Sequence, residues 1–133
     1  MNKLYDVSDL AGRILISVIF IMAGWGKIGG YAGTAAYMES MGVPGALLPL
    51  VIATELGGGI LVVLGLWTRL AALGLAGFSV LAGLLFHFKP DDQMQMMILM
   101  KNVAMGGGFL VIAAHGARAL SLDAWRARKA TSP

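Results

Sequence analysis

Four long apolar segments constrain the fold of this chain more than any other feature, and they lie at about residues 8–28, 45–67, 69–88 and 94–115. Each can cross a hydrocarbon core of roughly 30 Å as an α-helix, since a helix rises about 1.5 Å per residue. Only 13% of the residues are charged and the mean hydropathy is +0.79, whereas soluble domains carry about 25% charged residues. The sequence therefore predicts an all-α membrane protein, a four-transmembrane-helix bundle that forms a single domain over residues 1–133.

The connections between these segments predict further local structure. Within the longest one, Thr34–Met41 is expected to form a short interfacial helix between the first and second spans, because it carries an apolar side. Gly42 should follow its end, where a left-handed backbone favours glycine. Trp67 and Thr68 leave almost no loop between the second and third spans, which predicts a tight antiparallel hairpin. Ser8 is the expected N-cap of the first span.

Lysine and arginine are distributed unequally between the two sides of the predicted bundle. Four spans place the N-terminus, the second connection and the C-terminus on one side, which carries most of the basic residues: Lys3, Arg69, Arg118, Arg126, Arg128 and Lys129. The other side carries Lys27 and Lys89. Because cytoplasmic loops are enriched in lysine and arginine, both termini are expected in the cytoplasm. Residues 116–133 would form a basic cytoplasmic tail with a surface helix at Leu122–Lys129.

Charges inside the apolar segments indicate a polar interior. Glu55 is the only charge between Ala46 and Trp67, and a carboxylate at that depth usually faces a bundle interior and has a partner. Arg13 and Lys101 lie in other spans at compatible depths, so we expect Glu55 to pair with one of them. Three interpretations remain open: an ionic lock that fixes helix register, a pocket for a small anion or a quinone head group, and a proton path.

Small and polar residues at helical spacing predict which face of each helix turns inward. On the first span this stripe consists of Arg13, Ser17, Phe20, Gly24 and Lys27. Such residues let membrane helices approach closely. Gly74, Gly77 and Gly107 fall off the inward stripes, so we expect them to face outward, where they favour a homo-oligomer or a complex with a partner subunit.

Several classes of chemistry are excluded or weakly indicated. The chain has no cysteine, which excludes thiol redox chemistry, Fe–S clusters and zinc–thiolate sites on this chain. A methionine-rich stretch near His87 invites a copper(I) site, but packing explains it better, so we predict no metal. The net charge of +3 comes without a basic, aromatic-interleaved surface, which argues against nucleic acid. His87 itself is either an interface residue or a ligand and proton acceptor.

A set of short motifs recurs in a characteristic order along nearly the whole chain: Arg13, Ala23–Lys27, Gly42–Pro44, Glu55–Gly58, Leu64–Ala72, His87, Lys101–Asn102, Gly106–Leu110, His115–Arg118 and Ser121–Asp123. In this order and spacing they resemble the DoxX family of small bacterial inner-membrane proteins. One departure is Ala117, where many relatives have proline, and it concerns only the local turn. The family is named from a subunit of an archaeal membrane oxidoreductase that passes electrons from thiosulfate to quinone, so the resemblance implies an association with quinone-linked redox chemistry.

These observations predict a multi-pass protein of the bacterial inner membrane whose charged pocket is formed by Arg13, Glu55, His87, Lys101 and Asn102. The preferred function is a redox-associated subunit that binds a quinone-like or small anionic ligand. The alternative is a non-enzymatic scaffold or small-solute transport protein whose buried charges are structural. No residue is an evident redox centre and no covalent cofactor is predicted, so electrons would be carried by a quinone, another cofactor or a partner. The expected partners are the lipid bilayer and either a second copy or a redox subunit.

Overall fold

Residues 2–131, which are the residues that this computed structural model describes, are mostly helical, and no strand occurs among them. The long helices are α1 (Lys3–Gly29), α5 (Thr68–His87) and α6 (Gln93–His115), and the shorter ones are α2 (Tyr31–Ser40) and α7 (Leu122–Ala130). Four consecutive pieces make up the second span: a 3₁₀ turn η1 (Gly45–Leu47), α3 (Leu48–Ile52), a π-helical turn η2 (Ala53–Gly57) and α4 (Gly58–Leu64). The predicted all-α class is confirmed. Residues 132 and 133 of the predicted tail lie outside the described residues, as does residue 1.

Four helical stretches are long and apolar enough to cross a membrane: Lys3–Gly29, Gly45–Leu64, Thr68–His87 and Gln93–His115. They coincide with the four predicted spans apart from their ends. The first helix begins before Ser8, so the predicted cap is wrong. The cap is Asn2, whose side chain accepts a hydrogen bond of 2.9 Å from the backbone N of Leu4. The second span ends at Leu64 because Gly65 adopts a left-handed φ of 68°.

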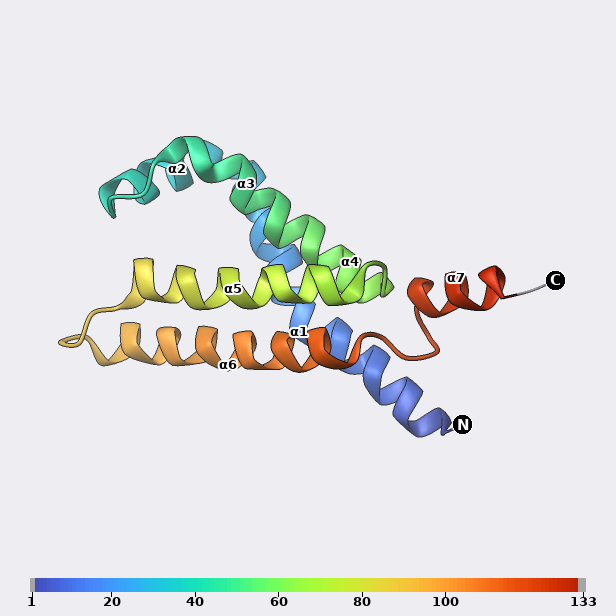
Figure 1. The fold of residues 1–133 in the computed structure, drawn as a ribbon. Helices are drawn as coiled ribbons and strands as arrows, with labels where there is room; N and C mark the ends of the chain where they lie inside the picture. The colour runs from blue at the N-terminus through green and yellow to red at the C-terminus, as the bar shows by residue number, and fades with distance from the viewer. Residues whose placement is uncertain (1, 132–133) are drawn as a thin grey trace.

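The helices are arranged as an antiparallel pair with two crossing spans. Helices α5 and α6 lie side by side along their whole length, while α1 crosses behind them and α3 and α2 diverge from them (Figure 1). Both termini and the α4–α5 turn lie at one end of the bundle, which we call the terminal end. Helix α2 and the α5–α6 turn lie at the other, distal end. Two termini at one end agree with four spans, whereas their assignment to the cytoplasm stays a prediction.

An apolar core occupies the middle of the bundle and separates its two ends. Its buried members are Phe20, Val62, Ala72, Leu75, Ala76 and Phe109. The Phe20 ring meets the Phe109 and Phe78 rings edge to face, with centroid distances of 5.4 and 6.5 Å. Aromatic pairs of this kind add about 0.5–1.5 kcal/mol beyond their buried area.

The register between the first two spans is fixed by a close backbone approach at Gly24. A Cβ atom at this position would lie 2.8 Å from the backbone N of Leu56, so only glycine lets α1 approach the π-helical turn this closely. Gly74, Gly77 and Gly107 show the opposite situation, because a Cβ atom there would meet no atom within 4 Å. These three glycines therefore face outward, as predicted.

Candidate functional site

The structure divides the predicted cluster of buried charges between two places. Arg13 is buried at the terminal end, Glu55 is buried in the distal half, and Lys101 is exposed on the outer side of α6. The predicted pairing of Glu55 with Arg13 or Lys101 is wrong, since the partner of Glu55 is Lys27, whose Nζ lies 2.7 Å from its Oε1.

Helix register explains this error. Because Gly24 contacts Leu56, the carboxylate of Glu55 lies level with the last turn of α1, where Lys27 stands. Arg13 precedes Gly24 by eleven residues, which corresponds to about 16 Å along a helix axis. Lys101 is the neighbour of the inward-facing Asn102, and successive side chains on a helix point about 100° apart. Similar depth in the membrane is therefore not enough to predict which charged side chains pair, because helix register and rotation also decide it.

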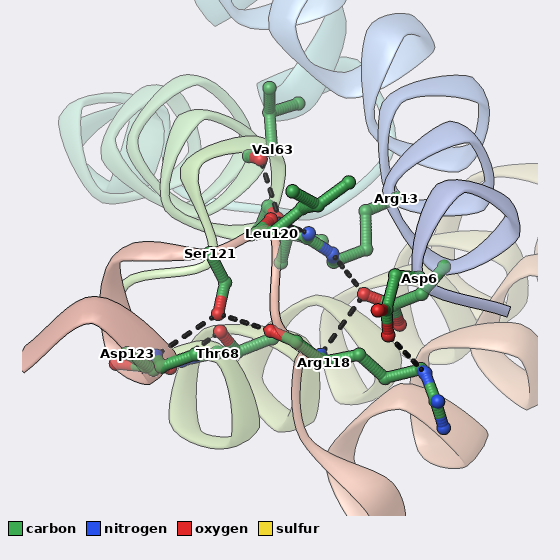
Figure 2. A network of polar contacts seen from close by, with 11 residues as sticks. Asp6, Arg13, Val63, Thr68, Arg118, Leu120, Ser121 and Asp123 are labelled. Carbon is green, nitrogen blue, oxygen red and sulfur yellow. Dashed lines mark hydrogen bonds and ion pairs between the residues drawn. The ribbon is translucent and has the colours of Figure 1, made fainter. Parts of the chain in front are cut away.

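Arg13 is the centre of a hydrogen-bond network at the terminal end (Figure 2). Its Nε donates to Asp9 Oδ2 at 3.0 Å, and its Nη1 donates to the carbonyl oxygens of Val62 and Val63 at 3.1 and 2.9 Å. Its Nη2 donates to the carbonyl oxygen of Leu120 in the tail. The carbonyls of Val62 and Val63 belong to the last turn of α4, and that of Val62 also accepts from the backbone N of Gly65 at 3.1 Å. One arginine thus joins α1, α4 and the tail.

The chain between α6 and α7 takes part in the same network through Arg118. Its backbone N donates to Asp9 Oδ2 at 3.1 Å, and its Nε donates to Asp6 Oδ1 at 2.9 Å. Its guanidinium also lies over the ring of Tyr5, 5.6 Å from the centroid. The carboxylates of the first turns of α1 therefore hold the segment that follows α6.

Asp123 at the start of α7 caps α5 from a distant part of the chain. Its carboxylate accepts hydrogen bonds from the backbone N of Trp67 at 2.8 Å, and from the backbone N and hydroxyl of Thr68 at 2.9 and 2.6 Å. Partial burial raises the pKa of Asp123. The Thr68 and Trp67 hydrogen bonds, together with attraction to Arg126, outweigh it, so its pKa lies below the ordinary value. This cap accompanies a left-handed φ of 47° at Trp67.

Gly65 makes this packing possible. Its φ is 68°, and a Cβ atom there would lie 2.3 Å from Ser121 Cβ and 2.7 Å from Arg13 Nη1. A shallow cavity of about 390 Å³ borders the same region, and its wall includes Trp67, Arg69 and His115. Two polar groups in that wall are already engaged, because Arg69 bonds the carbonyl of His115 and Asp123 caps α5. The polar groups at the terminal end therefore hold helices and tail together and have a structural role.

A cavity of about 270 Å³ lies in the distal half, between α1, α2, the second span, α5 and α6. We call it the distal cavity. Its wall is largely apolar and includes four aromatic residues: Phe20, Tyr37, Phe78 and Phe86. The rings of Tyr37 and Phe86 stack with a centroid distance of 5.7 Å. Its polar lining consists of Lys27, Thr34, Glu55, His87 and Asn102.

Glu55 lies in the middle of the π-helical turn Ala53–Gly57. Such turns are rare and frequently occur at functional sites, because the wider turn reorients a side chain. The Oε1 atom of Glu55 is the one that lies 2.7 Å from the ammonium of Lys27, and Glu55 is buried. The side chain of Lys27 is 27% exposed. The ammonium of Lys27 has three donors, so the pair retains hydrogen-bonding capacity in a pocket wall.

The cavity contains three of the five predicted site residues, namely Glu55, His87 and Asn102. Arg13 and Lys101 are not part of its wall. Sequence reasoning missed Lys27, which had been assigned to a membrane surface from the charge distribution. The signal was present, because Lys27 belongs to the same inward stripe as Gly24 at a spacing of three residues. Among residues 2–131, no three His, Asp or Glu side chains come together as metal ligands would.

The chemical character of the distal cavity follows from these neighbours. Its aromatic walls suit a flat ring, and the ammonium of Lys27 and the amide of Asn102 can donate hydrogen bonds to acceptors on such a ring. His87 and Glu55 add groups that can accept. The site thus combines a mostly apolar hollow with a few convergent polar groups, as small-molecule sites generally do.

Comparisons with known proteins identify a family and several relatives. The sequence model of the DoxX family matches residues 8–88. The chain is 51% identical over 123 residues to inner membrane protein YqjF of Escherichia coli (strain K12), which covers 92% of this chain and 95% of that protein. It is 36% identical over 121 residues to inner membrane protein YphA of the same strain, covering 86% of each.

A more distant relative comes from Bacillus subtilis (strain 168) and bears the name "Putative oxidoreductase CatD". It is 31% identical over 127 residues, which make up 92% of this chain and 90% of that protein. No solved structure matches the chain.

Proposed function

This chain belongs to the DoxX family of inner-membrane proteins, and on that premise we propose that it is a redox-associated subunit that binds a quinone-like ligand in the distal cavity. The observation that carries the proposal is the coincidence of the Lys27–Glu55 ion pair with an aromatic-walled hollow of about 270 Å³. That volume lies just below the usual range of about 300–1,000 Å³ for ligand sites. It suits a ring head group whose apolar tail remains in lipid.

The polar groups of the cavity match the chemistry of a quinone. Quinone carbonyls accept hydrogen bonds, and Lys27 and Asn102 can donate them. Because the interior is apolar, an ammonium next to a ring oxygen interacts more strongly than it would in water. The name of the Bacillus subtilis relative, "Putative oxidoreductase CatD", supports redox chemistry. Since this chain has no cysteine, the electrons would reside on the ligand and on a partner.

The alternative functions receive less support from the geometry. A structural role fits Arg13, whose donors are engaged by Asp9 and three backbone carbonyls, and does not explain the distal cavity. A transport path would have to pass the core formed by residues such as Phe20 and Phe109, both of which are buried. A small anion beside Lys27 remains a variant of the same binding proposal.

Topology and assembly complete the proposal. Both termini would be cytoplasmic, because the terminal end carries most of the basic residues, and the distal cavity would then open in the outer half of the membrane. The outward-facing Gly74, Gly77 and Gly107 have open space around them. Small residues on an outer surface let a second copy or a partner redox subunit approach.

The experiment that tests the proposed function measures ligand binding directly. Protein purified in mild detergent is analysed for co-extracted quinone by mass spectrometry and then titrated with a short-chain ubiquinone. Asn102→Leu should weaken binding by about tenfold, which is the effect of losing one hydrogen bond to a buried polar group. Glu55→Gln should weaken binding to a similar extent, because Lys27 loses the carboxylate that holds its ammonium at the cavity wall. Lys101→Gln is the matched control, because Lys101 adjoins Asn102 but points outward. Equal affinity in all four proteins, or no binding at all, would refute the proposal.

A further inference from the structure

His87 and Gln95 form a hydrogen bond that closes the distal end of the α5–α6 pair. His87 is the last residue of α5, and Gln95 lies in the first turn of α6. The Nδ1 atom of His87 lies 2.8 Å from the Oε1 atom of Gln95. An amide oxygen can only accept hydrogen bonds, so the hydrogen of this bond must reside on Nδ1. The contact therefore selects one of the two neutral forms of the imidazole ring.

This bond leaves His87 with a defined chemical function in the cavity. In a neutral imidazole that carries its hydrogen on Nδ1, the other nitrogen, Nε2, has a free lone pair and acts as an acceptor. His87 contributes to the wall of the distal cavity. A lone pair on Nε2 would add an acceptor to the donors that Lys27 and Asn102 bring to this wall.

The position of Gln95 is itself supported by the fold. Its backbone N donates to Asp92 Oδ1 at 3.2 Å, which caps α6. Beneath this turn, α5 and α6 approach closely at Gly83, where a Cβ atom would lie 2.8 Å from Leu99 and 3.1 Å from Asn102. Gln95 is therefore anchored on a well-packed helix pair, and its side chain can hold His87 in a constant orientation.

We propose that Gln95 is a positioning residue that fixes the tautomer of His87, and that the distal cavity consequently selects the reduced, hydroxyl-bearing form of its ring ligand over the dicarbonyl form. This inference rests on the proposed function and specifies the ligand of the same site. A quinol hydroxyl donates to Nε2 while its second oxygen accepts from Lys27 or Asn102. A quinone carbonyl facing Nε2 brings two acceptors together, which leaves both unpaired in an apolar site.

The tautomer is tested without any ligand. Nitrogen-15 NMR spectra distinguish a protonated from an unprotonated ring nitrogen, and the chain has only two histidines, so His115→Gln assigns the signals of His87. At pH 8 we expect the hydrogen on Nδ1 in the unmodified protein and a mixture of tautomers in Gln95→Met. A hydrogen on Nε2 in the unmodified protein, or an unchanged spectrum in Gln95→Met, would overturn the role of Gln95.

The selectivity is tested with decylubiquinone and its two-electron-reduced form. The unmodified protein should bind the reduced form on the order of tenfold more tightly, because it avoids placing two acceptors against each other. In Gln95→Met this ratio should fall towards one. Gln93→Met is the matched control, since Gln93 is exposed in the same turn of α6 and should leave the ratio unchanged.

The possible outcomes separate this inference from the proposed function. Equal binding of the two forms by the unmodified protein would overturn the inference while the proposed function stands. A preference that persists in Gln95→Met would do the same. If neither form binds, the proposed function fails and the selectivity fails with it, even where the NMR spectra show the expected tautomer.

Discussion

The two ends of this bundle treat a buried charge in opposite ways. At the terminal end, the Arg13 side chain is 1% exposed and bonds one carboxylate and three backbone carbonyls. In the distal half, Glu55 has the single ion partner Lys27, and both side chains line a cavity. Removing one partner of a buried charge is costly, so the bonds of Arg13 hold the elements around it in place. A buried charged pair that lines a cavity and has unused hydrogen-bonding groups can bind a ligand.

Removal of Arg13 should cause the largest loss of stability, because it breaks the hydrogen-bond network at the terminal end. Arg13→Met removes the guanidinium that bonds Asp9 and three backbone carbonyls, and losing one partner of a buried pair costs about 3–5 kcal/mol. We expect a much lower thermal unfolding temperature in detergent, measured by tryptophan fluorescence, and a lower yield. Lys101→Met is the control and should unfold close to the unmodified protein. A variant as stable as that control would contradict the structural role of the terminal network.

Replacement of Glu55 should destabilise the protein less than replacement of Arg13, and it should weaken ligand binding more. Glu55→Gln keeps the shape of the side chain and removes the charge that faces Lys27. Because Lys27 is partly exposed, its ammonium can move towards water, so we expect a loss of about 1–2 kcal/mol, as for one charged hydrogen bond. Ligand binding should weaken by about tenfold in the same protein. Thermal unfolding curves of the two variants provide the test. If Glu55→Gln unfolds at as low a temperature as Arg13→Met, the two buried charges do not have different roles.

Much of the fold could be predicted because it depends on properties that sequence displays directly. Apolar length gave the four spans, and charge with helix propensity gave the tail helix, predicted at Leu122–Lys129 and found at Leu122–Ala130. The left-handed Gly42, with φ of 81°, was also predicted. The π-helical turn Ala53–Gly57 was not, because nothing in its residues distinguishes it from a regular helix.

The candidate site was predicted in part, and the failures have a common cause. Glu55, His87 and Asn102 were found because charge and polarity inside apolar segments are visible in the sequence. The partners of Arg13 and Glu55 were not found, since pairing depends on helix register and rotation, which Gly24 sets through a contact with Leu56. Three of the four acceptors around Arg13 are backbone carbonyls. Every residue carries such a carbonyl, so the sequence does not distinguish these three from the rest.

The smallest expected effect concerns pH at the terminal end, where Asp123 caps α5. Burial raises the pKa of this carboxyl, but hydrogen bonds from Thr68 and Trp67 and attraction to Arg126 hold it below the ordinary value of 3.8. A group whose pKa is lowered in the folded state stabilises that state above its unfolded pKa. This contribution is lost as the pH falls through the folded pKa. We therefore expect no change from this group between about pH 5 and 8, and a loss of stability below about pH 4.

Asp123→Asn isolates that contribution from those of the other carboxylates. Its unfolding temperature should lie below that of the unmodified protein at pH 7, and the difference should shrink towards zero as the pH falls below the folded pKa. The cap is partly exposed to solvent, so screening limits its contribution to less than about 1 kcal/mol. A difference that stays constant down to pH 3 would mean that the amide side chain fits the cap poorly and that the charge of Asp123 contributes nothing. The stability of the terminal end would then come from Arg13 and the carbonyls around it. This titration therefore tests whether the charge of Asp123 adds to that stability.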